Sequence, residues 1–140
     1  MTPKTSATIV RLAAYGFLVF AFVWALAPYT PVSEPAHMLV DLLHWPLGDE
    51  PSPMSQNTVW LSSIGAGLVV ALGIFLLGLV VPALESGDRR TIRVAIFAML
   101  GWFVVDSAGS IASGVASNAA FNAVFLIVIL VPLLMVKHEN

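Results

Sequence analysis

The chain of 140 residues contains no cysteine and very little charge. The absence of cysteine excludes disulfides, cysteine–zinc sites, iron–sulfur clusters and thiol catalysis. Charged residues make up 10% of the sequence and hydrophobic residues 59%, whereas soluble domains carry about 25% charged residues. Six basic and eight acidic residues are too few for a water-soluble surface or for a nucleic-acid-binding face. These shortages exclude an ordinary soluble domain, a disordered chain and a nucleic-acid-binding protein, and they leave a membrane protein.

Long apolar segments occupy most of the chain. A helix needs about 20 mostly apolar residues to cross a bilayer, and four segments meet that need, at about 7–28, 59–84, 91–113 and 118–136. We therefore predict an all-α integral membrane four-helix bundle, up-down-up-down, as a single transmembrane domain over residues 1–140. The first segment also resembles a signal peptide, but Pro28 would directly follow the cleavage site and block the peptidase. We expect this segment to stay as an anchor.

All six basic residues fall on one side of the predicted bundle. They lie before the first span, between the second and third spans, and after the fourth: Lys4, Arg11, Arg89, Arg90, Arg93 and Lys137. The two remaining connections, 29–58 and 114–117, contain none. Because Lys and Arg concentrate in cytoplasmic loops, we expect both termini in the cytoplasm.

The long connection between the first two spans contains a predicted amphipathic helix at about 34–45, lying on the outer membrane surface. Its polar residues Glu34, His37, Asp41 and His44 recur at helical spacing and therefore share one face. That pattern is typical of the solvated face of an interfacial helix. The side chains of His37, Asp41 and His44 also have the chemistry and spacing of metal ligands, and the sequence leaves both interpretations open.

The third span carries one acid, Asp106, within an otherwise apolar helix. An ionised Asp near the centre of a membrane helix costs about 2.5–3.5 kcal/mol on insertion scales, so we expect its carboxyl to face the bundle interior, to find donors or to be protonated. Hydroxyl and amide donors at a similar depth come from three helix ends: Ser110, Ser113, Asn118, Asn122, Ser62 and Ser63.

Two interpretations of this polar group remain open. Interhelical hydrogen bonds, each worth about 0.6 kcal/mol on average, would fix the helix register. Alternatively, the group forms an outer-side polar pocket that binds a proton, a cation or a small polar ligand.

The second span carries a row of small residues, Ser63, Gly67 and Ala71, at four-residue spacing. Rows of this kind let two helices approach closely. We expect the row to pack inside the bundle, with contact to another membrane protein or to a second copy of the chain as the alternative.

The segment 102–110 (WFVVDSAGS), followed by Asn118, Asn122 and the run to Pro132, is similar to small four-span bacterial membrane proteins of unassigned function. The overall layout is broadly similar to that of DoxX-like four-helix membrane proteins. The resemblance implies a bacterial cytoplasmic (inner) membrane and supports Asp106 as a family feature, and it implies no activity.

No catalytic signature is present in the sequence. We therefore expect a non-enzymatic protein with no catalytic residues and no cofactor. The leading hypothesis is a small accessory or interaction protein with an outer-side pocket around Asp106, whose partners are the lipid bilayer and another membrane protein. The alternatives are a proton- or cation-coupled transporter of small solutes that uses Asp106, and metal or cofactor binding by the outer-loop histidines and Asp41.

Overall fold

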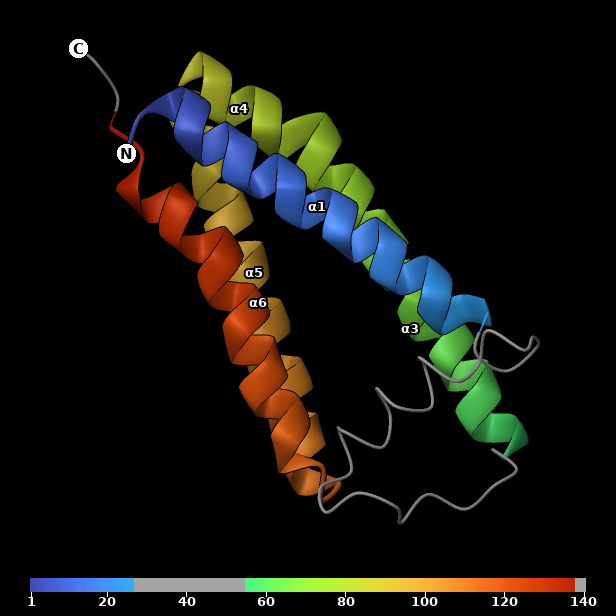
Figure 1. Ribbon diagram of the computed structural model, residues 1–140. Helices are drawn as coiled ribbons and strands as arrows, with labels where there is room; N and C mark the ends of the chain where they lie inside the picture. Colours follow the sequence, from blue (N-terminus) through green and yellow to red (C-terminus); the bar gives the residue numbers. More distant parts are fainter. Residues whose placement is uncertain (27–54, 138–140) are drawn as a thin grey trace.

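The computed structural model describes residues 1–26 and 55–137. Within these residues the chain is helical and contains no strand. The elements in chain order are α1 (Pro3–Leu26), α3 (Gln56–Phe75), the π-helical turn η1 (Leu76–Val80), α4 (Val81–Ser86), α5 (Arg89–Ala112) and α6 (Ala116–Met135) (Figure 1). The interfacial helix predicted for 34–45 lies outside the described residues.

Four helices are long and apolar enough to cross a membrane, and they correspond to the four predicted spans. They are Pro3–Leu26, Val59–Ser86, Arg89–Ala112 and Ala116–Met135. The second of them combines α3, η1 and α4 into one continuous helix. This architecture is compatible with a multi-pass membrane protein.

The helix α5 begins at Arg89, before the apolar segment from which the span was predicted. Asp88 is its N-cap: Oδ1 accepts hydrogen bonds from the backbone N–H groups of Arg90 (3.0 Å) and Thr91 (3.3 Å). The other oxygen, Oδ2, accepts from Thr91 Oγ1 over 2.6 Å. A capping carboxylate accepts hydrogen bonds from backbone amides that would otherwise lack partners. The helix can therefore begin at the polar residues before the apolar segment, which a hydropathy profile does not assign to the span.

Two glycines in the left-handed conformation end α4 and α5. Gly87 has a φ of 74°, and the N–H of Asp88 donates to the carbonyl of Ala83 over 2.9 Å. Gly114 has a φ of 83°, and the N–H of Val115 donates to the carbonyl of Ser110 over 2.9 Å. Both turns are of the Schellman type, which lets a helix end abruptly and the next one begin within a few residues.

The helices associate as two pairs, α1 with α3 and α5 with α6 (Figure 1). Glycines allow close approach in the first pair. A Cβ atom added at Gly73 would lie 2.8 Å from Leu18 Cδ2, and one added at Gly65 would lie 2.5 Å from the ring of Trp24. The α1/α3 pair is therefore packed through the face of α3 that carries these two glycines.

The row of Ser63, Gly67 and Ala71 lies on the outward face of α3. All three residues are exposed, and a Cβ atom added at Gly67 would meet nothing within 4 Å. The expectation that this row packs inside the bundle is therefore wrong. Only one face of α3 meets α1, and Gly65 and Gly73 occupy it; a shift of two residues turns a side chain by about 200° around a helix.

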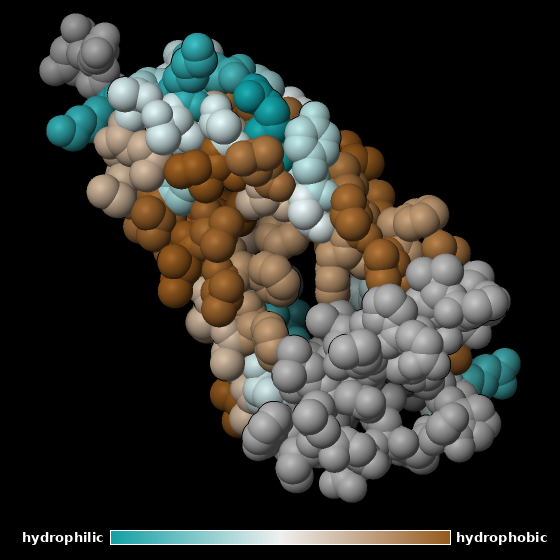
Figure 2. Space-filling model, viewed as in Figure 1, coloured by the Kyte–Doolittle hydropathy of each residue, from teal (hydrophilic) through white to brown (hydrophobic). Residues whose placement is uncertain are grey.

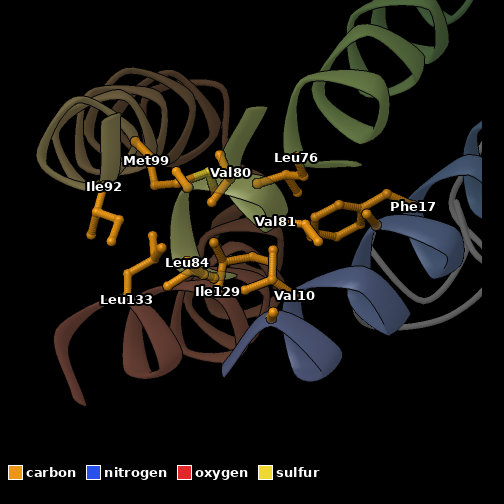
Figure 3. Packing of buried hydrophobic residues seen from close by; sticks show 14 of the residues in the cluster. Val10, Phe17, Leu76, Val80, Val81, Leu84, Ile92, Met99, Ile129 and Leu133 are labelled. Carbon is orange, nitrogen blue, oxygen red and sulfur yellow. The ribbon is translucent and has the colours of Figure 1, made fainter. Parts of the chain in front are cut away.

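All four helices come together only at one end of the molecule. A cluster of buried apolar side chains from α1, η1, α4, α5 and α6 fills this end (Figure 3). Val10, Leu76, Leu84, Met99 and Ile129 in it are at most 1% exposed. In a lipid environment such contacts stabilise through close van der Waals packing rather than through removal of apolar surface from water.

The same end carries the start of α1, the turn between α4 and α5, and the end of α6, where the six basic residues lie, and its surface is hydrophilic (Figure 2). We call it the basic end. The N-terminal ammonium of Met1 donates to the carbonyl of Met135 over 2.8 Å, and the N–H of Lys137 donates to the carbonyl of Met1 over 2.9 Å. Arg11 on α1 forms a 2.6 Å ion pair with Glu85 on α4. These contacts join the start of α1 to the ends of α4 and α6.

Away from the basic end the two helix pairs diverge (Figure 1). In this half α3 packs against α1, and α5 packs against α6. Large apolar side chains cover the outward faces; Val105 on α5, for example, is 75% exposed. An apolar surface of this kind is suited to contact with lipid chains. We call the end at which the described helix pairs diverge the open end.

Candidate functional site

The candidate site lies on the stripe of α5 that faces the other helices. Near the basic end this stripe consists of Ile92, Ala95 and Met99, all buried in the apolar cluster. Continuing at spacings of three and four residues, the same stripe reaches Asp106 and Ser110. Helical periodicity alone therefore directs the carboxyl of Asp106 toward the inside of the molecule.

The turn at Gly114 returns the chain along α5, and α6 begins at Ala116. Asn118 and Asn122 lie one helical turn apart on α6, so their side chains project from the same face. Because the turn is short, this face meets α5 at the level of Asp106. The Schellman turn is thus what positions the two amides.

Three side chains donate hydrogen bonds to one oxygen of Asp106. Oδ1 accepts from Asn118 Nδ2 and from Asn122 Nδ2, each over 3.0 Å, and from Ser110 Oγ over 3.2 Å. Asn118 Nδ2 also donates to Ser110 Oγ over 2.8 Å. Asn122 Nδ2 donates to Ser107 Oγ over 3.4 Å. We call these five residues the Asp106 cluster.

The second oxygen of the carboxyl group, Oδ2, receives no hydrogen bond from any residue in the described ranges. Asp106 is half-buried, whereas Asn122 is only 4% exposed. Among the described residues the one ion pair joins Arg11 to Glu85, so no cation there balances Asp106. Within residues 1–26 and 55–137, the carboxyl is therefore held by neutral donors at Oδ1 alone.

The cluster lies where the two helix pairs begin to separate. On α6, one turn from Asn122 toward the basic end, Phe125 makes an edge-to-face contact with Phe17 of α1, with ring centroids 5.3 Å apart. It also contacts Phe20, at 6.2 Å. The space-filling view shows hydrophilic surface between the two helix pairs (Figure 2). The aromatic contact joins α6 to α1 one helical turn from Asn122 of the Asp106 cluster.

Three of the residues predicted for the site lie elsewhere. Ser113 Oγ donates to the carbonyl of Gly109 over 2.8 Å, and Ser63 Oγ donates to the carbonyl of Val59 over 3.0 Å, so each bonds to its own helix. Ser62 is half-buried on α3, which packs against α1 rather than against α5 or α6. The structure does not bring these serines to Asp106.

The sequence prediction omitted one member of the cluster, Ser107, which is 7% exposed. Its hydroxyl oxygen accepts from Asn122. The sequence could have indicated it, because Ser107 directly follows Asp106 and its side chain therefore projects about 100° around the helix from that of Asp106. That side of the helix faces α6 here.

The predicted metal ligands His37, Asp41 and His44 lie outside the described residues. Within residues 1–26 and 55–137, no three His, Asp or Glu side chains gather in a way that could hold a metal ion. The metal interpretation of the outer loop therefore stays a prediction.

Comparison of the chain with models of known families, with curated proteins and with solved structures finds no match. The resemblance to small four-span bacterial proteins and to the DoxX-like layout consequently stays a prediction. The function has to be argued from the geometry of the Asp106 cluster.

Proposed function

We propose that this chain is a non-enzymatic accessory protein of the bacterial inner membrane that binds a cationic or hydrogen-bond-donating group at Asp106. In this proposal its four helices cross the bilayer up-down-up-down, with both termini in the cytoplasm. The gathering of the six basic residues at one end of the molecule supports that orientation, because basic residues favour the cytoplasmic side. The open end, with the cluster, then faces the outer side.

The observation that carries the binding proposal is the asymmetry of the Asp106 carboxyl group. Three donors converge on Oδ1, and Oδ2 receives none from the described residues. Hydrogen bonds that hold α5 against α6 require only Oδ1. The second oxygen is oriented by the same three contacts, since they restrain rotation of the carboxyl group, and it is thus a preorganised acceptor.

The electrostatics of the site select the class of ligand. Hydrogen bonds to a charged group contribute about 1.5–3 kcal/mol each, and all three that Asp106 receives come from neutral groups. The site therefore keeps a formal negative charge when Asp106 is ionised. A metal cation, an ammonium or a guanidinium group, or a partner's N–H group, would complete its coordination.

Binding of cations to purified protein tests this proposal. Wild-type protein in neutral detergent is titrated with sodium, potassium, methylammonium and guanidinium ions, and the thermal unfolding midpoint is recorded at constant ionic strength. We expect at least one of the four to raise the midpoint of wild type and to leave that of Asp106→Asn unchanged. Glu85→Gln, which removes an acid at the basic end, should respond as wild type does. Equal shifts in all three proteins, or none in wild type, would contradict the proposal.

A second candidate function is proton- or cation-coupled transport of a small solute. It is favoured by the position of Asp106, an acid that lies within a candidate membrane span and away from the ends of that span. Acids in such positions mark the ion and proton pathways of many transporters. In proteoliposomes, transport predicts a pH-dependent flux that Asp106→Asn abolishes. Cation binding without flux would support the accessory role instead.

As an accessory protein the chain needs a surface for its partner, and we propose the outward row of Ser63, Gly67 and Ala71 on α3. The row is exposed along its length, and small residues allow another helix to approach closely. Gly67→Leu should reduce cross-linking to a partner or to a second copy. Gly78→Leu is the matched control, because a Cβ atom there also meets nothing within 4 Å. Equal cross-linking in both variants would exclude this surface.

A further inference from the structure

A groove of about 510 Å³ lies at the basic end, between the start of α5 and the end of α6. Its lining changes character along its length. Arg89 and Arg93 belong to the first turns of α5, and apolar side chains line the rest, among them Ile96, Leu133 and Leu134. The groove is therefore cationic at the end of the molecule and apolar toward the middle of the helices.

The two arginines in this groove form no ion pair with an acid in residues 1–26 and 55–137. Within these residues, Glu85 is paired with Arg11. The carboxylate of Asp88 caps α5. Arg93 Nε donates to the carbonyl of Arg89 over 3.4 Å, which leaves the two terminal nitrogens of Arg93 available as donors.

We propose that this groove binds one anionic phospholipid of the cytoplasmic leaflet. The phosphate is held by the guanidinium groups of Arg89 and Arg93, and an acyl chain lies along Ile96 and Leu134. Guanidinium groups present paired N–H donors that match the geometry of phosphate oxygens. The backbone amides at the start of α5 take no part, because Asp88 already caps them.

The positive charge at one end of the groove and its apolar lining toward the other favour this ligand. Basic pockets between membrane helices on the cytoplasmic side bind anionic headgroups, and each basic residue near such a surface contributes about 1 kcal/mol, or about fivefold in affinity. A zwitterionic lipid would bring a choline cation close to two guanidinium groups that have no acidic partner among the described residues. Free phosphate would leave the apolar part of the groove unused. The proposal requires the basic end to lie at the membrane surface, and it does not depend on Asp106.

Native mass spectrometry of the full chain, released from nanodiscs that contain equal amounts of phosphatidylglycerol and phosphatidylcholine, tests the proposal. We expect one retained phosphatidylglycerol on wild type. The double substitution Arg89→Gln/Arg93→Gln should reduce this occupancy by about tenfold or more, on the basis of about fivefold for each charge. Arg90→Gln is the control for general charge at this end: it removes one charge from the start of α5, but Arg90 does not line the groove. Its occupancy should fall by less than about threefold.

Each other outcome overturns the proposal. Loss of lipid to the same degree in Arg90→Gln would indicate non-specific attraction to the basic end. Equal retention of phosphatidylcholine by wild type would exclude headgroup selection. Displacement of the lipid by inorganic phosphate would identify a phosphate site instead. If the double glutamine variant fails to fold, as judged by circular dichroism and gel filtration, Arg89→Lys/Arg93→Lys replaces it, and this variant should keep more than about a third of wild-type occupancy.

Discussion

The side-chain amide of Asn122 on α6 donates over 3.0 Å to Oδ1 of Asp106 on α5, from a position that is only 4% exposed. This contact joins a buried amide to the only acid within the four candidate spans that lies away from their ends. It makes the contact between α5 and α6 polar at the open end, whereas apolar packing and the Arg11–Glu85 ion pair join the helices at the basic end.

Replacement of Asn122 by alanine should destabilise the protein by about 1–2 kcal/mol, because a buried donor is lost and Asp106 keeps fewer partners. The midpoint of unfolding in a denaturing detergent titration measures this change. Ser113→Ala is the control, since that exposed hydroxyl bonds only to its own helix, and it should change the midpoint little. Equal effects of the two substitutions would show that Asn122 contributes nothing specific.

Gly114→Ala should destabilise the protein by about 1–2 kcal/mol, because its φ of 83° is unfavourable for a residue with a Cβ atom. The same substitution should weaken cation binding at Asp106, since the turn positions Asn118 and Asn122. Thermal unfolding with and without the cation measures both effects. Gly109→Ala, within α5 and with no atom near the added Cβ, should be neutral or slightly stabilising. The reverse order of stabilities would contradict the role of the turn.

Gly73→Ala should loosen the α1/α3 pair, because its Cβ atom would lie 2.8 Å from Leu18 Cδ2. Overpacking of this kind costs about 1–3 kcal/mol. Gly67→Ala places the same methyl group on the open face of the same helix and should have little effect. Unfolding midpoints of the two variants, measured side by side, decide which face of α3 packs on α1; a larger loss for Gly67→Ala would reverse the assignment.

Asp88 should contribute stability that disappears in acid. The hydrogen bond from the Thr91 hydroxyl, followed by one from the Thr91 backbone N–H, holds the pKa of Asp88 below its ordinary 3.8. The folded state thus binds the proton less readily than the unfolded state. The contribution is fully present above about pH 4 and is lost as the pH falls through the lowered pKa.

This pH dependence is measured by comparing unfolding midpoints of wild type and Asp88→Asn at a series of pH values. The difference in unfolding midpoint between wild type and Asp88→Asn should decrease only below the ordinary pKa of aspartate. Thr91→Val, which removes the principal hydrogen bond to Asp88, should begin to lose stability at a higher pH than wild type. A difference between wild type and Asp88→Asn that is independent of pH would contradict the capping role.

The orientation in the membrane can be tested by cysteine labelling, since the chain has no cysteine of its own. Ser86 and Ser113 are both exposed, one at the basic end and one at the open end. In intact cells a membrane-impermeant maleimide should label Ser113→Cys, and should label Ser86→Cys only after permeabilisation. The opposite pattern would place the Asp106 cluster on the cytoplasmic side.

The helices themselves were predictable because hydropathy and length suffice to locate an apolar span. Their ends were less so: the start of α5 depends on the carboxylate of Asp88, and the end of α4 on the φ angle of Gly87. Both are effects of single residues, which a hydropathy profile averaged over a window of residues does not resolve. The π-helical turn before Pro82 was likewise not predicted; there the N–H of Val81 bonds to the carbonyl of Leu76, five residues back.

The sequence was sufficient to predict the part of the candidate site that comes from two helices joined by one short turn. Asp106, Ser110, Asn118 and Asn122 belong to two consecutive helices, and helical spacing is enough to place them together. Ser62 shares their expected depth but belongs to a helix whose partner is α1. The membrane depth of a residue can be predicted from its distance along a span. The direction in which its side chain points depends on how the helix packs. For α3 this direction is set by the glycines that contact α1.

The connection between the two helix pairs at the basic end is very short, consisting of Gly87 and Asp88 between α4 and α5. A rotation of one pair relative to the other about these residues would move the far ends of the helices most. A helix of 24 residues such as α5 is about 36 Å long, so a rotation of about 5° at the connection would move its far tip by about 3 Å. A ligand bound at the Asp106 cluster, as proposed, would lie in the half of α5 that such a rotation displaces more.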